Sequence, residues 1–290
     1  MIRIDYKLRY SAIVVLTTAL LSSCIYDGDA GCMQYIIKPV IESKGGVQQN
    51  DTTVKIIKAY LFRDGKYERE VEPESNGSFI VDFTKGQNSS LSIFGYPSTD
   101  SLNEISPKTD DTIASSAVTL SALTGNAAPQ GLHYGRFDYT QSTPAATGKE
   151  ISVAVLKERA SVHVVVENLT EMYSSGGDYR IELSGLRNAA SYDGAIGGDS
   201  VTYVPDAAVD NKSNLCSKAE YTLPTKQGEG VTVTIYRNNS LIWQSSKDAQ
   251  GNEATLSSGD DKALIVDIER RNAGFQVMQW SDYVVSTVIN

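Results

Sequence analysis

Cys24 is the residue whose surroundings point most directly to a chemical modification. Three basic residues lie within the first nine positions, and an uncharged apolar stretch follows over residues 11–21. A stretch of this length is too short to span a bilayer comfortably, but it fits the core of a secretory signal peptide. It ends in Leu21-Ser22-Ser23 directly before Cys24, and small residues before a cysteine are typical of a lipobox. We therefore expect cleavage after residue 23 and a diacylglycerol thioether on Cys24 that holds the mature chain on a membrane.

A short acidic segment and two further cysteines follow the expected lipid attachment site. Asp27 and Asp29 lie within a predicted linker over residues 24–33. Acids in this position resemble a surface-export signal of Bacteroides-like lipoproteins, and the alternative is that they are simply solvated. Cys32 and Cys216 are the remaining cysteines, and an exported compartment permits a disulfide between them. Two unpaired thiols are the alternative, because sequence spacing does not show whether the two residues approach each other.

The overall charge and the scarcity of catalytic side chains exclude several functional classes. The 290-residue chain has a formal net charge of −9 and a pI of about 4.8, whereas nucleic-acid binding needs a basic face. It contains no G-x-S-x-G, H-E-x-x-H or P-loop motif. His133 is expected on the surface in a loop, and His163 half-exposed on the face of a strand opposite three valines. The sequence therefore predicts no enzyme, no cofactor and no metal site.

Paired acids and scattered aromatic residues are two weaker candidates for ligand binding. Asp110-Asp111 and Asp260-Asp261 lack the flanking oxygen ligands that calcium requires, so solvated turns are expected at both places. Trp243, Trp280 and the sixteen tyrosines are expected mainly in the core and as cross-strand partners. A sugar-stacking platform built on Trp243 or Trp280 is the alternative, and it would make the chain a glycan-binding surface lipoprotein.

The elements that must position these residues are predicted to be short strands. Apolar and polar residues alternate with a period of two, as in Val162, Val164 and Val166. Turn residues such as Asp64-Gly65 separate these runs, and Asp-Gly between two apolar runs is a strong hairpin signal. The predicted strands cover residues 34–41, 55–62, 67–71, 78–83, 91–96, 151–156, 161–167, 179–183, 201–204, 231–236, 241–243 and 264–268.

Few segments are predicted to be anything other than strands. Short helices are predicted over residues 114–123 and 168–173, and a long polar surface loop over residues 186–209. Many short strands separated by turn residues are typical of β-sandwiches. We therefore predict an all-β chain with two tandem β-sandwich domains, over residues 34–157 and 158–290.

The C-terminal segment is unusually apolar for the end of a chain. Its last eight residues contain no charged side chain, no proline and no glycine. The residues that dominate it are Tyr283, Val284, Val285, Val288 and Ile289. Such a segment promotes aggregation if it stays exposed, so it is expected to pair as a strand. It either forms the last strand of its own domain or adds to the sheet of another subunit, with alternate side chains filling pockets there.

Four segments of the chain match motifs of a known protein family. They are the lipobox leading into Cys24-Ile25-Tyr26-Asp27-Gly28-Asp29-Ala30-Gly31-Cys32, the hairpin Ala59-Tyr60-Leu61-Phe62-Arg63-Asp64-Gly65-Lys66-Tyr67, the strand Ser92-Ile93-Phe94-Gly95-Tyr96, and Phe275-Gln276-Val277-Met278-Gln279-Trp280. On these segments the chain resembles the FimB-like fimbrial anchor lipoproteins of type V pili in Bacteroides-like bacteria. The resemblance implies two transthyretin-like Greek-key domains. It also implies a subunit that ends a pilus, tethers it to the outer membrane and contacts pilin subunits by strand addition.

The positions of the arginines bear on whether the chain is an anchor or a shaft subunit. Shaft pilins of this class resemble precursors that lose their first strand by cleavage, often after Arg, and then accept a strand from a neighbour. Here no Arg occurs between Cys24 and Arg63, and Arg63 lies in the predicted hairpin turn. An uncut chain keeps both its lipid and its first strand, residues 34–41, which favours an anchor. A shaft or tip pilin trimmed by a different protease is the alternative within the same system.

Overall fold

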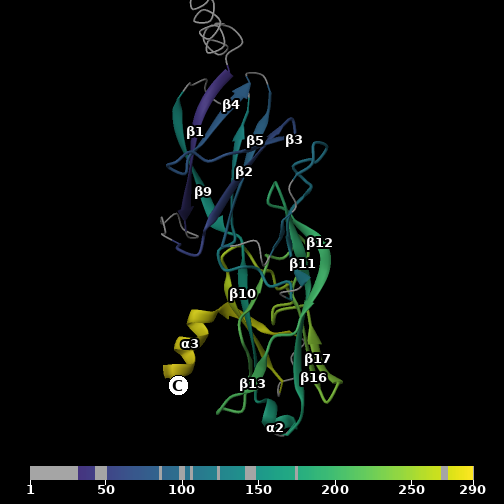
Figure 1. Ribbon diagram of the computed structural model, residues 1–290. Coiled ribbons are helices and arrows are strands. Elements are labelled where there is room, and N and C mark those ends of the chain that lie inside the picture. Colours follow the sequence, from purple (N-terminus) through teal and green to yellow (C-terminus); the bar gives the residue numbers. More distant parts are fainter. Residues whose placement is uncertain are drawn as a thin grey trace, which may run out of the picture.

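The computed structural model describes residues 32–42, 51–84, 87–97, 102–104, 107–122, 125–140, 148–173, 176–268 and 274–289. The predicted signal peptide, Cys24 and the acidic linker up to Gly31 lie outside these ranges. Within them nearly all regular structure is β (Figure 1), as the period of two predicted. No helix in the described ranges is long and apolar enough to cross a membrane.

The upper part of the molecule in Figure 1, drawn in purple, blue and teal, is built on a seven-stranded sheet, sheet A. Its strand order is β3-β2-β5-β8-β9-β1-β4, and the bounds are β1 (Cys32–Glu42), β2 (Ile56–Arg63), β3 (Lys66–Val71), β4 (Phe79–Thr84), β5 (Ser89–Tyr96), β8 (His133–Tyr139) and β9 (Lys149–Lys157). The two end strands approach each other, because Pro73 after β3 forms a bridge with Phe79 of β4. The sheet therefore folds over on itself, and its inner face encloses a core around Tyr35, Phe79 and Phe83.

The other part is a sandwich of two six-stranded sheets, sheets B and C. Sheet B has the order β17-β16-β11-β7-β6 with β12 beside β11, and its bounds are β6 (Leu102–Glu104), β7 (Ser116–Leu120), β11 (Tyr179–Ser191), β12 (Ile196–Tyr203), β16 (Thr232–Arg237) and β17 (Ser240–Ser245). Sheet C has the order β13-β14-β10-β18-β19 with β15 beside β10, and its bounds are β10 (Ala160–Glu167), β13 (Ala207–Val209), β14 (Leu215–Ser217), β15 (Glu220–Thr222), β18 (Asp261–Asp267) and β19 (Gln276–Gln279). Val162, Val164 and Val166 of sheet C lie in one core with Ile181 and Leu183 of sheet B.

A third core joins these two parts. Residues of β2 and β5 whose side chains point away from the core of sheet A, such as Phe62 and Phe94, pack around Tyr192 between β11 and β12. The Tyr192 carbonyl accepts hydrogen bonds from the Ser92 hydroxyl and, at 3.0 Å, from the Tyr134 hydroxyl. Both faces of β2 and β5 are therefore buried over residues 59–62 and 91–96.

The strand predictions are confirmed, because each predicted strand corresponds to an observed one. The hairpin between β2 and β3 has positive φ at both turn residues, 48° at Asp64 and 79° at Gly65. Two successive positive φ values define a type I′ turn, which Asp-Gly adopts at little cost. The short helix expected at residues 168–173 is also present, as α2 (Leu169–Tyr173).

Three expectations about local structure are wrong. Residues 116–120, within the segment 114–123 that was expected to be helical, form strand β7, which pairs with β6 and β11 and buries Val118 and Leu120. Residues 186–209 are not a loop, since they hold the end of β11 and strands β12 and β13. β1 begins at Cys32, inside the predicted linker. Strands β1 and β7 pair with strands distant in sequence, whereas β12 and β13 pair with the neighbouring strands β11 and β14. Local propensity does not report these pairings.

The C-terminal segment is also not a strand. Trp280–Ile289 forms helix α3, which follows directly on β19. The strand-prone residues Val284, Val285, Val288 and Ile289 therefore lie in a helix. Asp282 is in the first turn, where the helix dipole favours a carboxylate. The i, i+3 spacing of Trp280 and Tyr283 places both aromatic rings on one side of the helix, facing sheet C. This tertiary contact overrides the β-propensity of the segment.

Candidate functional site

Strand β1 lies inside sheet A, not at its edge. It pairs in parallel with β9 on one side and antiparallel with β4 on the other. Ile37 is in register with both Ile151 and Phe79, and the side chains of Tyr35 and Ile37 are fully buried. The strand that an anchor is expected to keep therefore fills a groove between β4 and β9. Its removal would leave two unpaired strand edges and an open core.

Arg63 stands at the end of β2, where the chain enters the type I′ turn. Its guanidinium contacts the Glu68 carboxylate across the hairpin and donates to the Asp82 carbonyl of β4 at 3.1 Å. Proteases bind their substrates in extended form, and a tight paired turn does not offer that conformation. The structure therefore places Arg63 at the tight hairpin turn that the sequence predicted.

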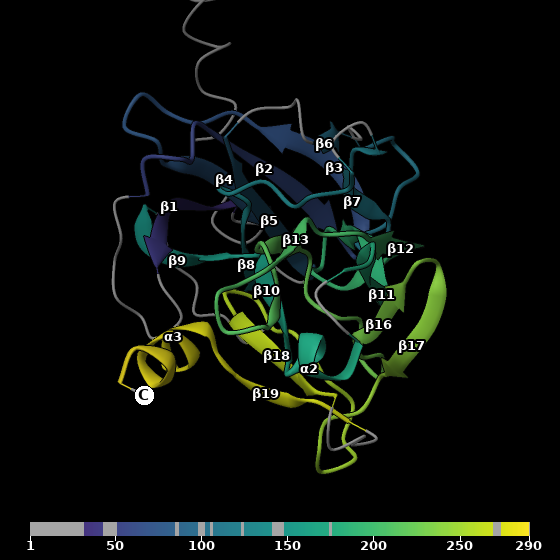
Figure 2. The ribbon, with the colours of Figure 1, turned by 90° about the horizontal axis from the view of Figure 1, so that it is seen from below.

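Helix α3 covers part of the outer face of sheet C. Figures 1 and 2 show it on the outside of the molecule, next to β10 and β18. Tyr283 is 8% exposed and lies in a small apolar cluster with Val165, Ala263 and Ile265, which are on that face of the sheet. Val284, one residue later, is 40% exposed. Among the helix residues whose side chains the structure describes, Tyr283 packs on the sheet and Val284 is largely exposed.

Of the two alternatives left open for Cys32 and Cys216, a disulfide or unpaired thiols, the structure gives Cys216 as an unpaired thiol. Cys216 is a free cysteine in β14 of sheet C, whereas Cys32 begins β1 of sheet A. The Cys216 thiol faces the Asp210 carboxylate at 3.7 Å. Burial, together with this carboxylate, raises the pKa of the thiol to about 11, so it stays protonated and unreactive at neutral pH.

One of the two histidines occupies a different environment from the one expected, and the other lies as predicted. His133 is not a surface loop residue: it is 1% exposed at the start of β8, its Nδ1 lies 3.0 Å from the Gly131 carbonyl, and its Nε2 lies 3.7 Å from Asp51. His163 is half-buried as predicted, on the outer face of β10. Its ring stacks on Trp280 with 3.8 Å between centroids, and its Nε2 is 3.4 Å from Asp261. Burial lowers the pKa of His163 although Asp261 opposes the effect, so its ring is neutral at pH 7.

The two tryptophans do not form an open aromatic platform. Trp243 of β17 packs against the core of the sandwich and meets Phe275 edge-on at 6.2 Å. Trp280 has one ring face covered by His163 and lies 5.4 Å from the Tyr283 ring. Stacking on a sugar needs a free ring face. Trp280 is thus better placed to position His163 than to stack on a ligand.

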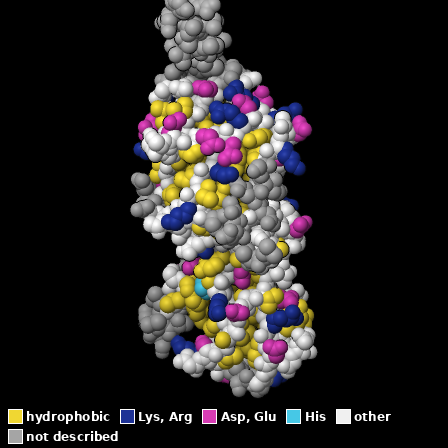
Figure 3. All heavy atoms as spheres, in the orientation of Figure 1, with side chains coloured by type: hydrophobic (Ala, Val, Ile, Leu, Met, Phe, Trp, Pro, Cys, Tyr) yellow, Lys and Arg dark blue, Asp and Glu magenta, His cyan; other side chains and the backbone are white. Residues whose placement is uncertain are grey.

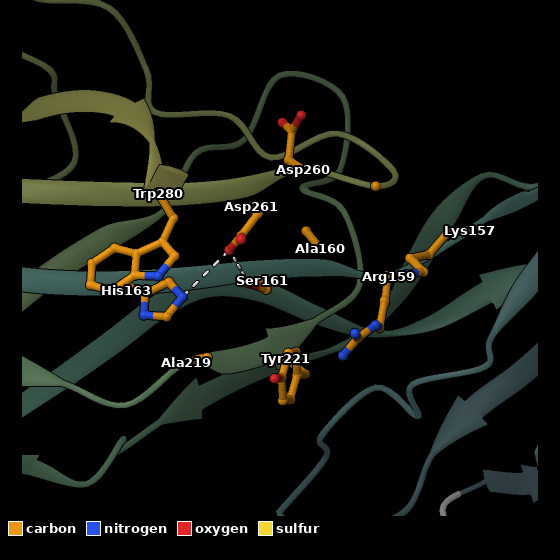
Figure 4. A pocket seen from close by; sticks show the side chains of 11 residues that line it. Lys157, Arg159, Ala160, Ser161, His163, Ala219, Tyr221, Asp260, Asp261 and Trp280 are labelled. Atoms are coloured by element: carbon orange, nitrogen blue, oxygen red, sulfur yellow. Dashed lines mark hydrogen bonds and ion pairs between the residues drawn. The ribbon is translucent and has the colours of Figure 1, made fainter. Parts of the chain in front are cut away.

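A pocket of about 370 Å³ opens beside Trp280 (Figure 4). Its walls come from the link between β9 and β10, from β10 itself, and from the segments leading into β15, β18 and α3. The polar and aromatic residues that line it are Lys157, Arg159, Ser161, His163, Tyr221, Asp260, Asp261 and Trp280. A volume of this size suits a small organic ligand. Sequence reasoning singled out four of these residues separately but did not bring them together.

The two acid pairs, Asp110-Asp111 and Asp260-Asp261, differ in their burial and in their contacts. Asp110 and Asp111 lie in a polar turn as predicted, where the Asp111 carboxylate accepts the Lys108 N–H at 2.8 Å. Asp260 is instead 9% exposed, and its carboxylate accepts the Ser257 N–H at 2.8 Å. Asp261 is exposed at the start of β18. Among the described residues, no three His, Cys, Asp or Glu side chains come together as a metal site.

Acidic and basic side chains are interspersed over the face seen in Figure 3, which has no continuous basic area. This agrees with the net charge of −9. Nucleic-acid phosphates need a clustered basic surface, which this face does not offer.

Comparisons with known proteins place the chain among fimbrial proteins. A family model described as "Fimbrillin-A associated anchor proteins Mfa1 and Mfa2" matches residues 21–281. Among solved structures, the fimbrial anchor protein Mfa2 from Porphyromonas gingivalis is 15% identical with a TM-score of 0.61, covering 85% of this chain and 95% of that chain. A protein from Bacteroides ovatus described as "a putative adhesin" is 16% identical with a TM-score of 0.57, covering 88% and 94%. No curated protein matches in the corresponding sequence search. At these identities the solved structures establish a shared fold.

Proposed function

This chain belongs to the family of fimbrillin-A associated anchor proteins Mfa1 and Mfa2, and on that basis we propose that it ends a type V pilus and tethers it to the outer membrane. It is a pilus-associated protein, and the similar proteins are described as anchor and adhesin proteins, not as enzymes. The observation that carries the anchor role is the position of β1 between β4 and β9. A subunit whose groove is already filled by its own strand accepts no strand from a neighbour, so the fibre stops there.

The membrane attachment is proposed to be a lipid on Cys24. Residues 1–23 contain three basic residues and one acid, so the mature chain carries a charge of (26 − 3) − (35 − 1) = −11. Anionic headgroups repel such a body, and the linker from Cys24 leads directly into β1. Two or more acyl chains at about 0.8 kcal/mol per buried methylene are enough for stable attachment.

Replacing Cys24 by Ala is expected to release the protein from the outer membrane, because it removes the thiol that carries the lipid. Fractionation of cells followed by immunoblotting measures the change. Cys216→Ala is the matched control, because that free thiol is half-buried in β14 and should not affect membrane retention. Equal membrane retention of Cys24→Ala and the unmodified protein would contradict the lipid anchor.

The coupling to the neighbouring pilin is proposed to use the C-terminal residues Tyr283, Val284, Val285, Val288 and Ile289. These residues form a helix in the isolated chain, so strand addition requires α3 to leave sheet C and become extended. Their β-branched side chains lower the cost of that change, because they favour strands over helices. Tyr283 and Trp280 would act as the contacts that keep the segment folded back until a partner is present.

Truncation after Tyr283 tests the coupling. It keeps both aromatic contacts with sheet C, so the fold should survive, but it removes the extended segment that a partner groove would accept. We expect fibres to be shed into the medium and the number of attached fibres to fall by about tenfold, since most of the strand's main-chain hydrogen bonds are lost. Electron microscopy of cells and immunoblotting of medium measure this. Unchanged attachment with normal thermal stability would exclude the segment as the coupling element.

We further propose that the chain divides into two units at Lys157, where it passes from β9 of sheet A to β10 of sheet C. Strands β6 and β7 come from the first half of the sequence but belong to sheet B. Together with the core around Tyr192, they would make the two units resist bending relative to each other. A rigid body of this kind suits a subunit that carries mechanical load.

A further inference from the structure

The pocket beside Trp280 divides into a cationic half and a hydroxyl-binding half. Lys157 and Arg159, on the link between β9 and β10, line one side, and Ser161, His163 and Asp261 line the other (Figure 4). The small side chains of Ala160 and Ala219 also line it, so no large group fills the space between. A ligand of matching chemistry would carry an anionic group at one end and hydroxyl groups at the other.

The cationic half is arranged to accept a carboxylate. The Arg159 guanidinium lies over the Tyr221 ring at 4.1 Å from its centroid, which fixes its plane and leaves its N–H groups at the edge. In the described part of the chain, no carboxylate oxygen lies within 4.0 Å of Lys157 or Arg159. A guanidinium held in one plane can give a carboxylate two parallel hydrogen bonds, and the positive charge of Lys157 on the pocket wall adds attraction.

The other half is arranged to accept hydroxyl groups. The Asp261 carboxylate accepts the Ser161 hydroxyl and faces His163 Nε2 at 3.4 Å. Trp280 stacks on the imidazole at an interplanar angle of 2° and so fixes its orientation. Asp261 is exposed, and a carboxylate has acceptor positions beyond those used by Ser161 and His163. It can therefore accept hydrogen bonds from one or two ligand hydroxyls.

We infer that this pocket binds a sugar residue that carries a carboxylate, such as a hexuronic acid. In a hexuronic acid the carboxylate and the hydroxyls on carbons 2 and 3 lie at opposite ends of one ring. The carboxylate would bind Arg159 and Lys157, and the hydroxyls would bind Asp261 and Ser161. The cavity of about 370 Å³ holds one such ring with its neighbouring linkage. This binding activity does not depend on the anchor role, and it would let the protein contact acidic polysaccharide.

Calorimetric titration of the full chain with methyl glucuronide, methyl glucoside and acetate tests the inference. Glucuronide should bind at least about tenfold more tightly than glucoside or acetate, because a charge-assisted pair is worth about 1.5–3 kcal/mol. Its affinity should fall as salt is added. Equal affinity for glucuronide and glucoside, equal affinity for glucuronide and acetate, or no binding at about 20 mM sugar would overturn the inference.

Two substitutions identify the residues that bind the ligand. Arg159→Gln should weaken glucuronide binding by about tenfold or more. Arg180→Gln is the matched control, because Arg180 also lies over a tyrosine ring, 4.4 Å from the centroid of Tyr236, but outside the pocket. Asp261→Asn should also weaken binding, through the ligand hydroxyls. A site that recognises only a carboxylate would instead bind more tightly after Asp261→Asn, because a negative charge has been removed, and that result would contradict the inference.

Discussion

Replacing Ile37 by Asp is expected to abolish most of the stability of the chain. Ile37 is fully buried in β1, in register with Phe79 on β4 and Ile151 on β9. The substitution removes a branched apolar side chain from the core of sheet A and puts a carboxylate with no partner in its place. Each effect costs several kcal/mol, and we expect a total of about 4 kcal/mol or more. Since domains are commonly stable by about 5–15 kcal/mol, little would remain.

Urea unfolding of the full chain, followed by circular dichroism, measures this loss. Lys38→Gln is the control on the next residue, since Lys38 is exposed and forms only a 3.8 Å surface ion pair with Glu150. It should change the free energy of unfolding by less than about 0.5 kcal/mol. An Ile37→Asp midpoint close to that of the unmodified chain would show that sheet A does not need β1. The argument that a retained first strand closes the groove would then fail.

The position of β1 between β4 and β9 determines what the loss of this strand would do to sheet A. A chain that loses this strand exposes the edges of β4 and β9 together with a core around Tyr35 and Ile37. Such a groove is stable only when another strand enters it. A chain that keeps the strand offers no such groove.

The strands of this fold were predictable because their sequences carry local signals. Val162, Val164 and Val166 alternate with polar residues, and Asp64-Gly65 adopts the type I′ turn that its sequence favours. Strand β7 was missed because it pairs with β6 and with β11, and β11 lies far away in the sequence. Burial of His133 likewise depends on distant segments, including Asp51. Local sequence patterns do not contain this information.

The strand prediction for the C-terminal segment was wrong for the opposite reason. Its β-prone residues gave a clear local signal, but Trp280 and Tyr283 find their partners on the outer face of sheet C at helical spacing. The pocket could not be assembled from the sequence either. Ser161, Tyr221 and Trp280 meet only because β10, β15 and the start of α3 converge in sheet C. The residue types were recognisable, but their proximity is a property of the fold.

Replacing Glu158 by Gln is expected to stabilise the chain at pH 8 but not at pH 4. Glu158 lies between β9 and β10 and is only 7% exposed. Its backbone N–H bonds to the Leu132 carbonyl at 2.9 Å, and its carboxyl accepts the Ser258 hydroxyl at 3.2 Å. Burial raises the pKa of this carboxyl from 4.5 to about 7, and the single hydroxyl donor only partly offsets the effect. A glutamine has the same shape and keeps the acceptor for Ser258 without a charge.

The sign of the pH dependence follows from proton binding. Between about pH 4.5 and pH 7 the folded chain retains a proton on Glu158 that the unfolded chain has released, so the free energy of unfolding falls as the pH rises. Above pH 7 Glu158 is ionised in both the folded and the unfolded chain. The free energy of unfolding has then fallen by at most roughly 3 kcal/mol for this pKa shift. The Glu158→Gln variant lacks this loss, so the stability difference between variant and unmodified chain should grow from near zero at pH 4 to roughly that value at pH 8.

Urea unfolding at pH 4, 6 and 8 measures this difference, and Glu229→Gln supplies a control of opposite sign. The hydrogen bonds and charge of Arg187, at 2.6 Å, lower the pKa of Glu229, so its ionised form stabilises the folded state. That variant should be less stable than the unmodified chain at neutral pH, and the deficit should shrink as the pH falls. A stability difference for Glu158→Gln that is equal at pH 4 and pH 8 would mean that Glu158 is already ionised in the folded chain. The link between β9 and β10 would then contain a buried charge, and the Glu158 carboxylate would need a hydrogen-bond or ionic partner in addition to Ser258.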